Sequence, residues 1–263
     1  MKLVSLNIWG GMQFDALMEF VRSEAKDTDI FCFQEVFDTT TDFKTFGTAR
    51  ICRVNMLEEF REALSNFDSY FAPCQDGWTF DGFVDFPIAY GLAIFVRKGM
   101  KVEDVGEFYA YGRRNMRTAE QNDARSMGRN VQYLKIGLED LSLTIGNVHG
   151  YWVRAPKTDT PERIAQSEKI LDFLNKQTGD VILCGDFNLR PDTKSMAILE
   201  TKMRNLIKEF GIKTTRNELY ADLKIFNDYF ADYVLVSSSI EIRNFQVPYV
   251  LASDHLPMIL EFS

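Results

Sequence analysis

Six short segments of the sequence carry polar side chains at the ends of apolar runs. Five of these segments end or follow such a run, and one begins it. In chain order they are SLNIW with Asn7, FCFQEV with Gln34 and Glu35, IGNVHG with Asn147 and His149, LCGDFN with Asp186 and Asn188, FADYVLVS with Asp232, and ASDHLP with Asp254 and His255. Carboxylates, amides and imidazoles are groups that bind a hard metal ion, activate water and stabilise developing negative charge.

Histidine usage is the most informative part of this pattern. The chain contains two histidines, His149 and His255, and both lie within the six segments. A single histidine near a strand is more often a core residue whose ring is hydrogen-bonded internally. Here both histidines of the chain lie beside carboxamides or carboxylates, which is hard to explain by core packing. The pattern therefore favours a catalytic site.

The elements that must position these groups are strands and helices in alternation. Apolar runs rich in Val, Ile and Phe predict strands at 3–9, 30–36, 91–97, 131–137, 141–148, 181–184, 233–236 and 258–262. Helical periodicity predicts helices at 14–25, 163–175 and 194–200. The alternation indicates α/β layers, and a hairpin turning at Glu139-Asp140 makes part of the sheet antiparallel. Long polar stretches at 38–55, 75–87 and 109–128 are interpreted as functional or mobile loops.

Composition restricts the class of the protein. The chain has 263 residues and a formal net charge of −8, which disfavours tight sequence-independent binding to DNA, although a local basic patch can still act. The four cysteines are far apart and form no CxxC pair, so we expect no zinc site. We also expect neither a signal peptide nor a transmembrane segment, because no apolar run is long enough. The sequence therefore predicts one cytoplasmic, monomeric domain over residues 1–263.

The order and spacing of the six segments, from Asn7 to His255, resemble the endonuclease/exonuclease/phosphatase superfamily. The motifs LCGDFN and SDH, with QE and NxH upstream, are specific as a set. The resemblance implies an α/β fold, a four-layer sandwich in which two mixed β-sheets pack face to face with helices on the outside. It also implies a metal-dependent hydrolase of phosphate esters, with its active site at the strand ends between the sheets.

On this resemblance, Glu35 would be the main protein ligand of Mg²⁺, for which Mn²⁺ could substitute. Mg²⁺ prefers oxygen ligands and keeps several waters, so one or two carboxylates suffice. Asn7 would support the metal or the phosphate through its amide, and Asp254 would bind the metal directly or lie beside it. The alternative interpretations are a solvated strand-end Glu35 and an Asx turn at Asn7 before the glycine pair at 10–11.

The same resemblance implies the catalytic roles. Asp186 would orient or deprotonate the attacking water, and Asn188 would hold that water or a phosphate oxygen. His255 would bond a phosphate oxygen or relay a proton, and His149 would stabilise charge on the phosphoryl group. Asp232 would orient His255 by accepting its other ring proton, the alternative being a carboxylate at a strand edge. The sequence contains no GxSxG or HExxH motif.

The substrate is the least determined part of the prediction. Residues 109–129 contain five arginines against two acidic residues: Arg113, Arg114, Arg117, Arg125 and Arg129 against Glu120 and Asp123. Arginine clusters suit phosphate contacts, and we expect Arg113, Arg114 and Arg117 to bind substrate, with a solvated loop as the alternative. Trp152 could stack on a base. We therefore predict a phosphodiesterase acting on DNA or RNA, with a phospholipid or small-molecule phosphoester as the alternative substrate and an inactive binding module as the least favoured function.

Overall fold

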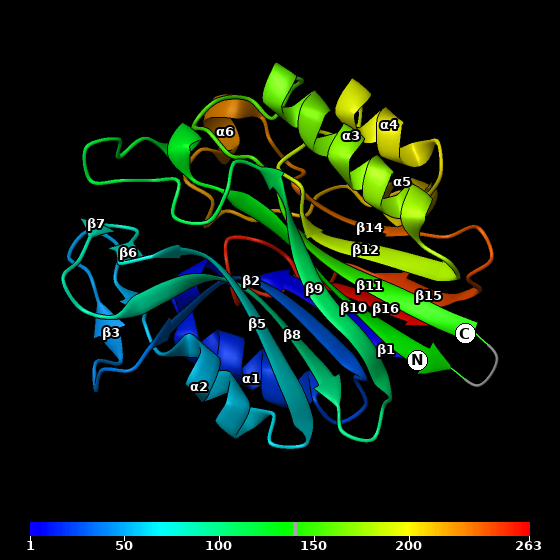
Figure 1. The fold of residues 1–263 in the computed structure, drawn as a ribbon, viewed down its shortest axis with the longest axis horizontal. Helices are drawn as coiled ribbons and strands as arrows, with labels where there is room; N and C mark the ends of the chain where they lie inside the picture. The colour runs from blue at the N-terminus through cyan, green and yellow to red at the C-terminus, as the bar shows by residue number, and fades with distance from the viewer. Residues whose placement is uncertain (139–140) are drawn as a thin grey trace.

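Two six-stranded β-sheets form the centre of the protein in the computed structural model, which describes residues 1–138 and 141–263 (Figure 1). The first sheet has the strand order β15-β16-β1-β2-β8-β5, and the second sheet has the order β13-β14-β12-β11-β10-β9. The first sheet contains β1 (Lys2–Asn7), β2 (Ile30–Thr39), β5 (Phe67–Asp76), β8 (Ile88–Arg97), β15 (Ile242–Gln246) and β16 (Met258–Phe262). The second sheet contains β9 (Val102–Tyr111), β10 (Arg129–Leu138), β11 (Leu141–His149), β12 (Asp180–Asp186), β13 (Arg204–Asn205) and β14 (Asp232–Val236).

Helices cover the outer face of each sheet (Figure 1). The first sheet is covered by α1 (Phe14–Glu24) and α2 (Met56–Ala63), and the second by α3 (Pro161–Lys176), α4 (Lys194–Glu200) and α5 (Leu206–Glu209). This order of helix, sheet, sheet and helix confirms the predicted four-layer α/β sandwich. No helix within the described residues is long and apolar enough to cross a membrane.

The connections contain the shorter elements. They are η1 (Trp9–Gly11), η2 (Ala124–Ser126), α6 (Leu223–Phe226), and two small sheets that pair β3 (Thr45–Phe46) with β4 (Cys52–Arg53) and β6 (Trp78–Thr79) with β7 (Gly82–Phe83). In Figure 1 the two small sheets lie together at one end of the sandwich, beyond the ends of the long strands. The two small sheets therefore lie at the same end of the sandwich as the last residues of β1, β11 and β12.

Strand β2 shows how one sequence run fills both sides of its sheet. Ile30 and Cys32 pack into the cluster between the two sheets, whereas Phe31 and Phe33 pack against the outer helices. The rings of Phe33 and Phe60 of α2, for example, are stacked with centroids 4.3 Å apart. Successive side chains of a strand point to opposite faces, so a strand that is buried on both faces needs a continuous apolar run.

All eight predicted strands and all three predicted helices are present, with bounds that differ by a few residues. The predicted turn at Glu139-Asp140 lies outside the described residues. The elements that were not predicted are the short elements of the connections, helices α2 and α5, and strands β5, β9, β13 and β15. Both β5 and β9 are edge strands, where exposed polar side chains interrupt the apolar pattern on which the prediction depended.

Candidate active site

Strand register places the predicted catalytic residues in a row across the second sheet. His149 ends β11 and lies opposite Asp186, which ends β12; Asp186 in turn lies opposite Asp232, which begins β14. In the first sheet, Asn7 ends β1 opposite Gln34 of β2. The polar positions at separate strand ends are therefore neighbours in space, because the strands that carry them are paired.

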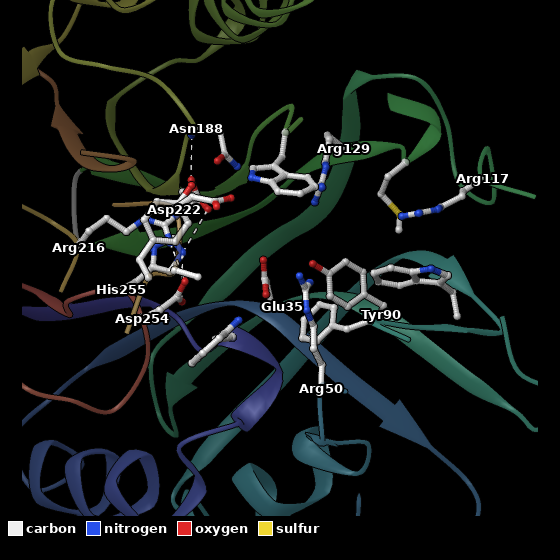
Figure 2. A pocket seen from close by; sticks show the side chains of 18 residues that line it. Glu35, Arg50, Tyr90, Arg117, Arg129, Asn188, Arg216, Asp222, Asp254 and His255 are labelled. Atoms are coloured by element: carbon white, nitrogen blue, oxygen red, sulfur yellow. Dashed lines mark hydrogen bonds and ion pairs between the residues drawn. The ribbon is translucent and has the colours of Figure 1, made fainter. Parts of the chain in front are cut away.

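A cavity of about 300 Å³ opens beside this row (Figure 2). Seven of the predicted site residues line it: Glu35, Arg117, Trp152, Asp186, Asn188, Asp254 and His255. Three others lie directly behind the lining. Asn7 contacts Asp186, His149 lies beside Glu35, and Asp232 contacts His255.

Glu35 reaches the cavity because of an irregularity in β2. The register of β2 against β8 shifts between Phe33 and Val36, and Glu35 adopts a left-handed backbone conformation with φ of 63°. Its Oε1 lies 3.6 Å from Nε2 of His149. Burial raises the pKa of Glu35 to about 7, and the negative charge of nearby Asp254 adds to the effect.

Asp186 is held from two sides. Its Oδ2 accepts a hydrogen bond from Nδ2 of Asn7 at 3.1 Å, and its Oδ1 accepts one from the backbone N–H of Asn188 at 2.9 Å. Asn188 has a left-handed backbone with φ of 54°, which turns the chain back over the carboxylate. Nε2 of His255 is 3.7 Å from Oδ2 of Asp186, and Nε2 of His149 is 4.0 Å away. Asp186 therefore has a fixed orientation between the two imidazoles.

His255 and Asp232 form a buried hydrogen-bonded pair. Nδ1 of His255 lies 2.8 and 2.9 Å from the two carboxylate oxygens of Asp232. Burial lowers the pKa of His255 and raises that of Asp232, so both shifts favour a neutral hydrogen-bonded pair over an ion pair. This is the contact expected of a carboxylate that orients His255. The free Nε2 faces the cavity.

Arg129 stands next to His149 and was not assigned a role from the sequence. Its Nη1 lies 3.0 Å from Nε2 and 3.2 Å from Nδ1 of the imidazole. Burial and then the charge of Arg129 hold the pKa of His149 well below its usual value. Because a guanidinium is always charged and His149 is neutral, Arg129 is the permanent positive charge at this position.

Arg216 is a second cation that sequence reasoning did not select. Its Nη1 donates to Oδ2 of Asp254 at 2.9 Å, and its guanidinium lies 4.1 Å from the centroid of the Tyr220 ring. Oδ1 of Asp254 is 3.7 Å from Nε2 of His255. Asp254, predicted beside the metal, is thus already paired with a buried cation.

Lys157 is a third missed residue and is fully buried. Its Nζ donates to Oδ1 of Asn188 at 2.6 Å, while Nδ2 of Asn188 donates to the carbonyl of Gly150 at 3.3 Å. Burial lowers the pKa of Lys157 to about 8. No sequence signal marked this lysine, because it stands alone in a connection between β11 and α3.

The predicted substrate-binding residues separate into two groups. Arg117 and Trp152 line the cavity, whereas the lining does not include Arg113 or Arg114. Arg114 is exposed and forms an ion pair with Asp76 at 3.0 Å. The loop that begins after β9 carries Arg113 and Arg114 outward and returns Arg117 inward, so we leave Arg113 and Arg114 out of the proposed site.

The ligand atoms at the cavity suit a hard divalent cation. One atom from each of Asp186, Asp232 and His255 lies within 4.8 Å of the other two. Carboxylate oxygens suit hard divalent cations, whereas an imidazole ligand also suits softer divalent ions, so this group by itself does not select the metal. The raised pKa of Glu35 also fits, because it marks a buried carboxylate for which a bound cation would supply the compensating charge.

Comparisons with known proteins agree with this fold. The model of the Endonuclease/Exonuclease/phosphatase family matches residues 4–255. No curated protein matches the chain. Three solved structures share the fold over 100% of this chain. They are an endonuclease/exonuclease/phosphatase from Bacteroides vulgatus (TM-score 0.70, 17% identity, 98% of that chain), a mannosyl-6-phosphatase from Bacteroides thetaiotaomicron (0.67, 17%, 99%) and the human Nocturnin catalytic domain with bound sulfate (0.63, 18%, 93%).

At these identities the solved structures establish the fold, and the family assignment rests on the family model, which spans nearly the whole chain. That match confirms the resemblance inferred from the motifs between Asn7 and His255. The chain belongs to the endonuclease/exonuclease/phosphatase family, a superfamily of hydrolases that act on phosphate esters and generally depend on a divalent metal.

Proposed function

We propose that the protein is a Mg²⁺-dependent phosphoesterase, with Mn²⁺ as a substitute, which hydrolyses a small phosphate ester by direct attack of water. The observation that carries the proposal is the fixed Asp186 carboxylate. It lies between His255 and His149 at the edge of the cavity, and Glu35 lies 3.6 Å from Nε2 of His149. This arrangement combines a proton acceptor for water with groups that neutralise charge on a phosphoryl oxygen.

The size of the cavity favours a small ester over a nucleic-acid strand. A volume of about 300 Å³ is at the lower end for small-molecule sites. Arg113 and Arg114, which the sequence suggested for holding a polyanion, are not part of its lining. Nucleic acid stays as the second candidate because Trp9 and Trp152 both line the cavity and could stack on bases.

The residues at the strand ends have different roles in the attack of water. Asp186 orients the attacking water and accepts its proton, and hydrogen bonds from Asn7 and Asn188 keep the carboxylate in place. His255 can relay that proton, because its Nδ1 is engaged by Asp232 and its Nε2 faces the carboxylate of Asp186. No covalent intermediate is required.

Charge neutralisation falls to the cations and the metal. Arg129 donates beside His149, and Arg216 lies beside Asp254, so both can face oxygens of the phosphoryl group. Glu35 would hold the metal, with Asp254 and Asn7 beside it. A bound divalent cation would act there as a Lewis acid that polarises a phosphoryl oxygen.

A substrate panel tests the proposal. Purified protein is incubated with p-nitrophenyl phosphate, bis-p-nitrophenyl phosphate, sugar phosphates and single- and double-stranded oligonucleotides, each with Mg²⁺ and with EDTA. We expect turnover of small esters with Mg²⁺, loss in EDTA and recovery when Mg²⁺ is restored. His255→Ala should lower kcat by about a hundredfold or more with a native circular dichroism spectrum, whereas Arg125→Gln, an exposed arginine outside the lining, should be unchanged.

Two outcomes would overturn parts of this assignment. Full activity in EDTA would contradict the metal-dependent mechanism. Turnover of oligonucleotides without turnover of any small ester would transfer the assignment to the nucleic-acid candidate.

A further inference from the structure

The cavity contains more positive charge than water attack on one phosphate requires. Arg50, Arg117 and Arg129 all line it, in addition to Arg216. Within residues 1–138 and 141–263, none of the first three forms an ion pair with a carboxylate. Arg216, by contrast, forms an ion pair with Asp254 at 2.9 Å.

Four carboxylates line the cavity, Glu35, Asp186, Asp222 and Asp254, and two of them are already paired with arginines. Asp254 is engaged by Arg216, and Asp222 is engaged by Arg154 at 2.9 Å. Figure 2 shows Arg117 and Tyr90 on one side of Glu35, and Arg216, Asp254 and His255 on the other. The paired Arg216 and Asp254 therefore lie on one side of Glu35, and Arg117, which has no carboxylate partner within the described residues, lies on the other.

Burial makes this charge costly without a ligand. Arg129 is 6% exposed, and its Nε is a buried donor that has no hydrogen-bond partner in the described part of the chain. Burial and then the charge of Arg129 lower the pKa of Arg117, which places two guanidinium groups close enough to repel each other. An anion between them would remove the repulsion.

Aromatic residues give the same end of the cavity a fixed shape. The rings of Trp78, Phe80 and Tyr90 pack edge to face, with centroids 5.3 to 6.0 Å apart. The guanidinium of Arg117 lies 4.9 Å from the centroid of the Trp78 ring. The rings thus hold Arg117 in place at this end of the cavity.

We propose that this end of the cavity, formed by Arg50, Arg117, Arg129, Trp78, Phe80 and Tyr90, binds a second anionic group of the substrate. The preferred substrate is then a phosphate ester that carries another phosphate or a carboxylate near the ester that is cleaved. This inference rests on the proposed function, because it assigns the catalytic end of the cavity to the scissile phosphate. Arg117 acts as a specificity residue for the second anion, and Arg129 lies between the two ends.

Matched substrate pairs test the inference. The pairs are fructose 1,6-bisphosphate with fructose 6-phosphate, adenosine 3′,5′-bisphosphate with adenosine 5′-monophosphate, and 3-phosphoglycerate with glycerol 3-phosphate. For at least one pair, the second anion should raise kcat/KM by about tenfold or more, the lower range for one charge-assisted hydrogen bond. In the first two pairs the additional anionic group is a phosphate, and in the third pair it is a carboxylate.

Two variants separate the subsite from general electrostatics. Arg117→Gln should lower kcat/KM for the doubly charged substrate by about tenfold more than for its partner, mostly through KM. Arg125→Gln removes an exposed arginine of the same segment that is paired with Asp123, and it should leave the ratio of the two kcat/KM values unchanged. An equal loss for both members of each pair in Arg117→Gln would overturn the inference.

Binding to Asp186→Asn, measured by calorimetry with Mg²⁺, distinguishes the two proposals. Turnover of simple esters with no preference in kinetics or binding would overturn the second-anion subsite and leave the phosphoesterase. Tighter binding of the bisphosphates, without turnover of any ester by the native protein, would overturn the phosphoesterase and leave the subsite. Absence of both would overturn both.

Discussion

At the scale of single residues, the site depends on how Asp186 is held. Asn7 and the backbone of Asn188 each donate to one of its oxygens, and both imidazoles lie within 4.0 Å. Rotation of the Asp186 carboxylate would break both of these hydrogen bonds. The carboxylate is therefore oriented before substrate binds, and no further free energy is needed to orient it during the reaction.

Asp186→Asn should therefore stop turnover while substrate still binds. The change keeps the shape and removes the charge that accepts the proton, so kcat should fall by several orders of magnitude. Asn188→Ala should cost less, about 2.7–4 kcal/mol if it resembles the loss of one transition-state donor. Because both serve one step, the double variant should be little worse than Asp186→Asn alone. Losses in kcat that multiply would instead show independent roles.

Lys157 should act through Asn188. Its Nζ donates to Oδ1 of the amide, so Lys157→Met should free the amide to rotate and lower kcat by about tenfold, or about 1.4 kcal/mol. The pKa of Lys157 is lowered to about 8, so its charge is present below that pH and lost above it. The native pH profile of kcat should decline near pH 8, and Lys157→Met should lack this limb.

The control for this prediction is Lys169→Met, which removes an exposed lysine of α3. It should leave the profile unchanged. Lys157→Met combined with Asn188→Ala should be no slower than Asn188→Ala alone. A further loss in the double variant would show that Lys157 acts on the reaction by another route.

At the scale of elements, the active site is made by departures from regular structure. Glu35 and Asn188 both adopt a left-handed backbone, one at an irregularity in β2 and the other just after β12. For Glu35 this conformation costs roughly 1–2 kcal/mol, whereas asparagine adopts it more readily. Backbone strain of this kind persists at functional sites because the displaced side chain is needed where the strain puts it.

Glu35→Gly should be more stable than Glu35→Ala. Both remove the carboxylate and should abolish metal-dependent activity, but glycine accepts the φ of 63° without strain. We expect a free energy of unfolding about 1 kcal/mol higher for the glycine variant, measured by urea denaturation monitored by circular dichroism. Equal stabilities would mean that the backbone at this position is not strained.

At the scale of the whole molecule, a buried amide connects the two sheets behind the site. Nδ2 of Asn147 in β11 donates to the carbonyls of Phe33 at 3.0 Å and Ala93 at 3.3 Å, both in the first sheet. Its Oδ1 accepts from Nε2 of Gln34 at 2.7 Å. These bonds set the distance between Glu35, two residues after Phe33, and the row that contains Asp186.

Asn147→Ala should affect stability and activity together. Two buried carbonyls lose their donor, which should lower the free energy of unfolding by about 1–3 kcal/mol. The loss of the connection next to Glu35 should also lower kcat. Gln132→Ala is the matched control, because its amide donates across the same interface to the carbonyl of Tyr70, away from the cavity. It should cost stability without changing kcat; activity that is retained in Asn147→Ala would contradict the positioning role.

Much of the site could be predicted from the sequence because its signals are local. Asp186, His149 and Asp232 each directly follow, end or begin an apolar run, and such a run becomes a strand wherever both of its faces are buried. The polar residue at the end of a buried strand must then lie at the edge of the sheet. The layered α/β arrangement follows from the same alternation of strands and helices.

The tertiary structure alone decided which of these residues meet, and which further residues join them. Lys157 and Arg216 approach the site from connections, and Arg129 approaches it from the start of β10, where the arginine-rich segment did not indicate which of its members would face the site. The same lack of long-range information explains why Arg113 and Arg114 were expected to bind substrate but do not line the cavity. A cluster of arginines in the sequence does not determine the direction in which its loop folds. Contacts between residues far apart in the chain depend on strand pairing and packing, which no short stretch of sequence encodes.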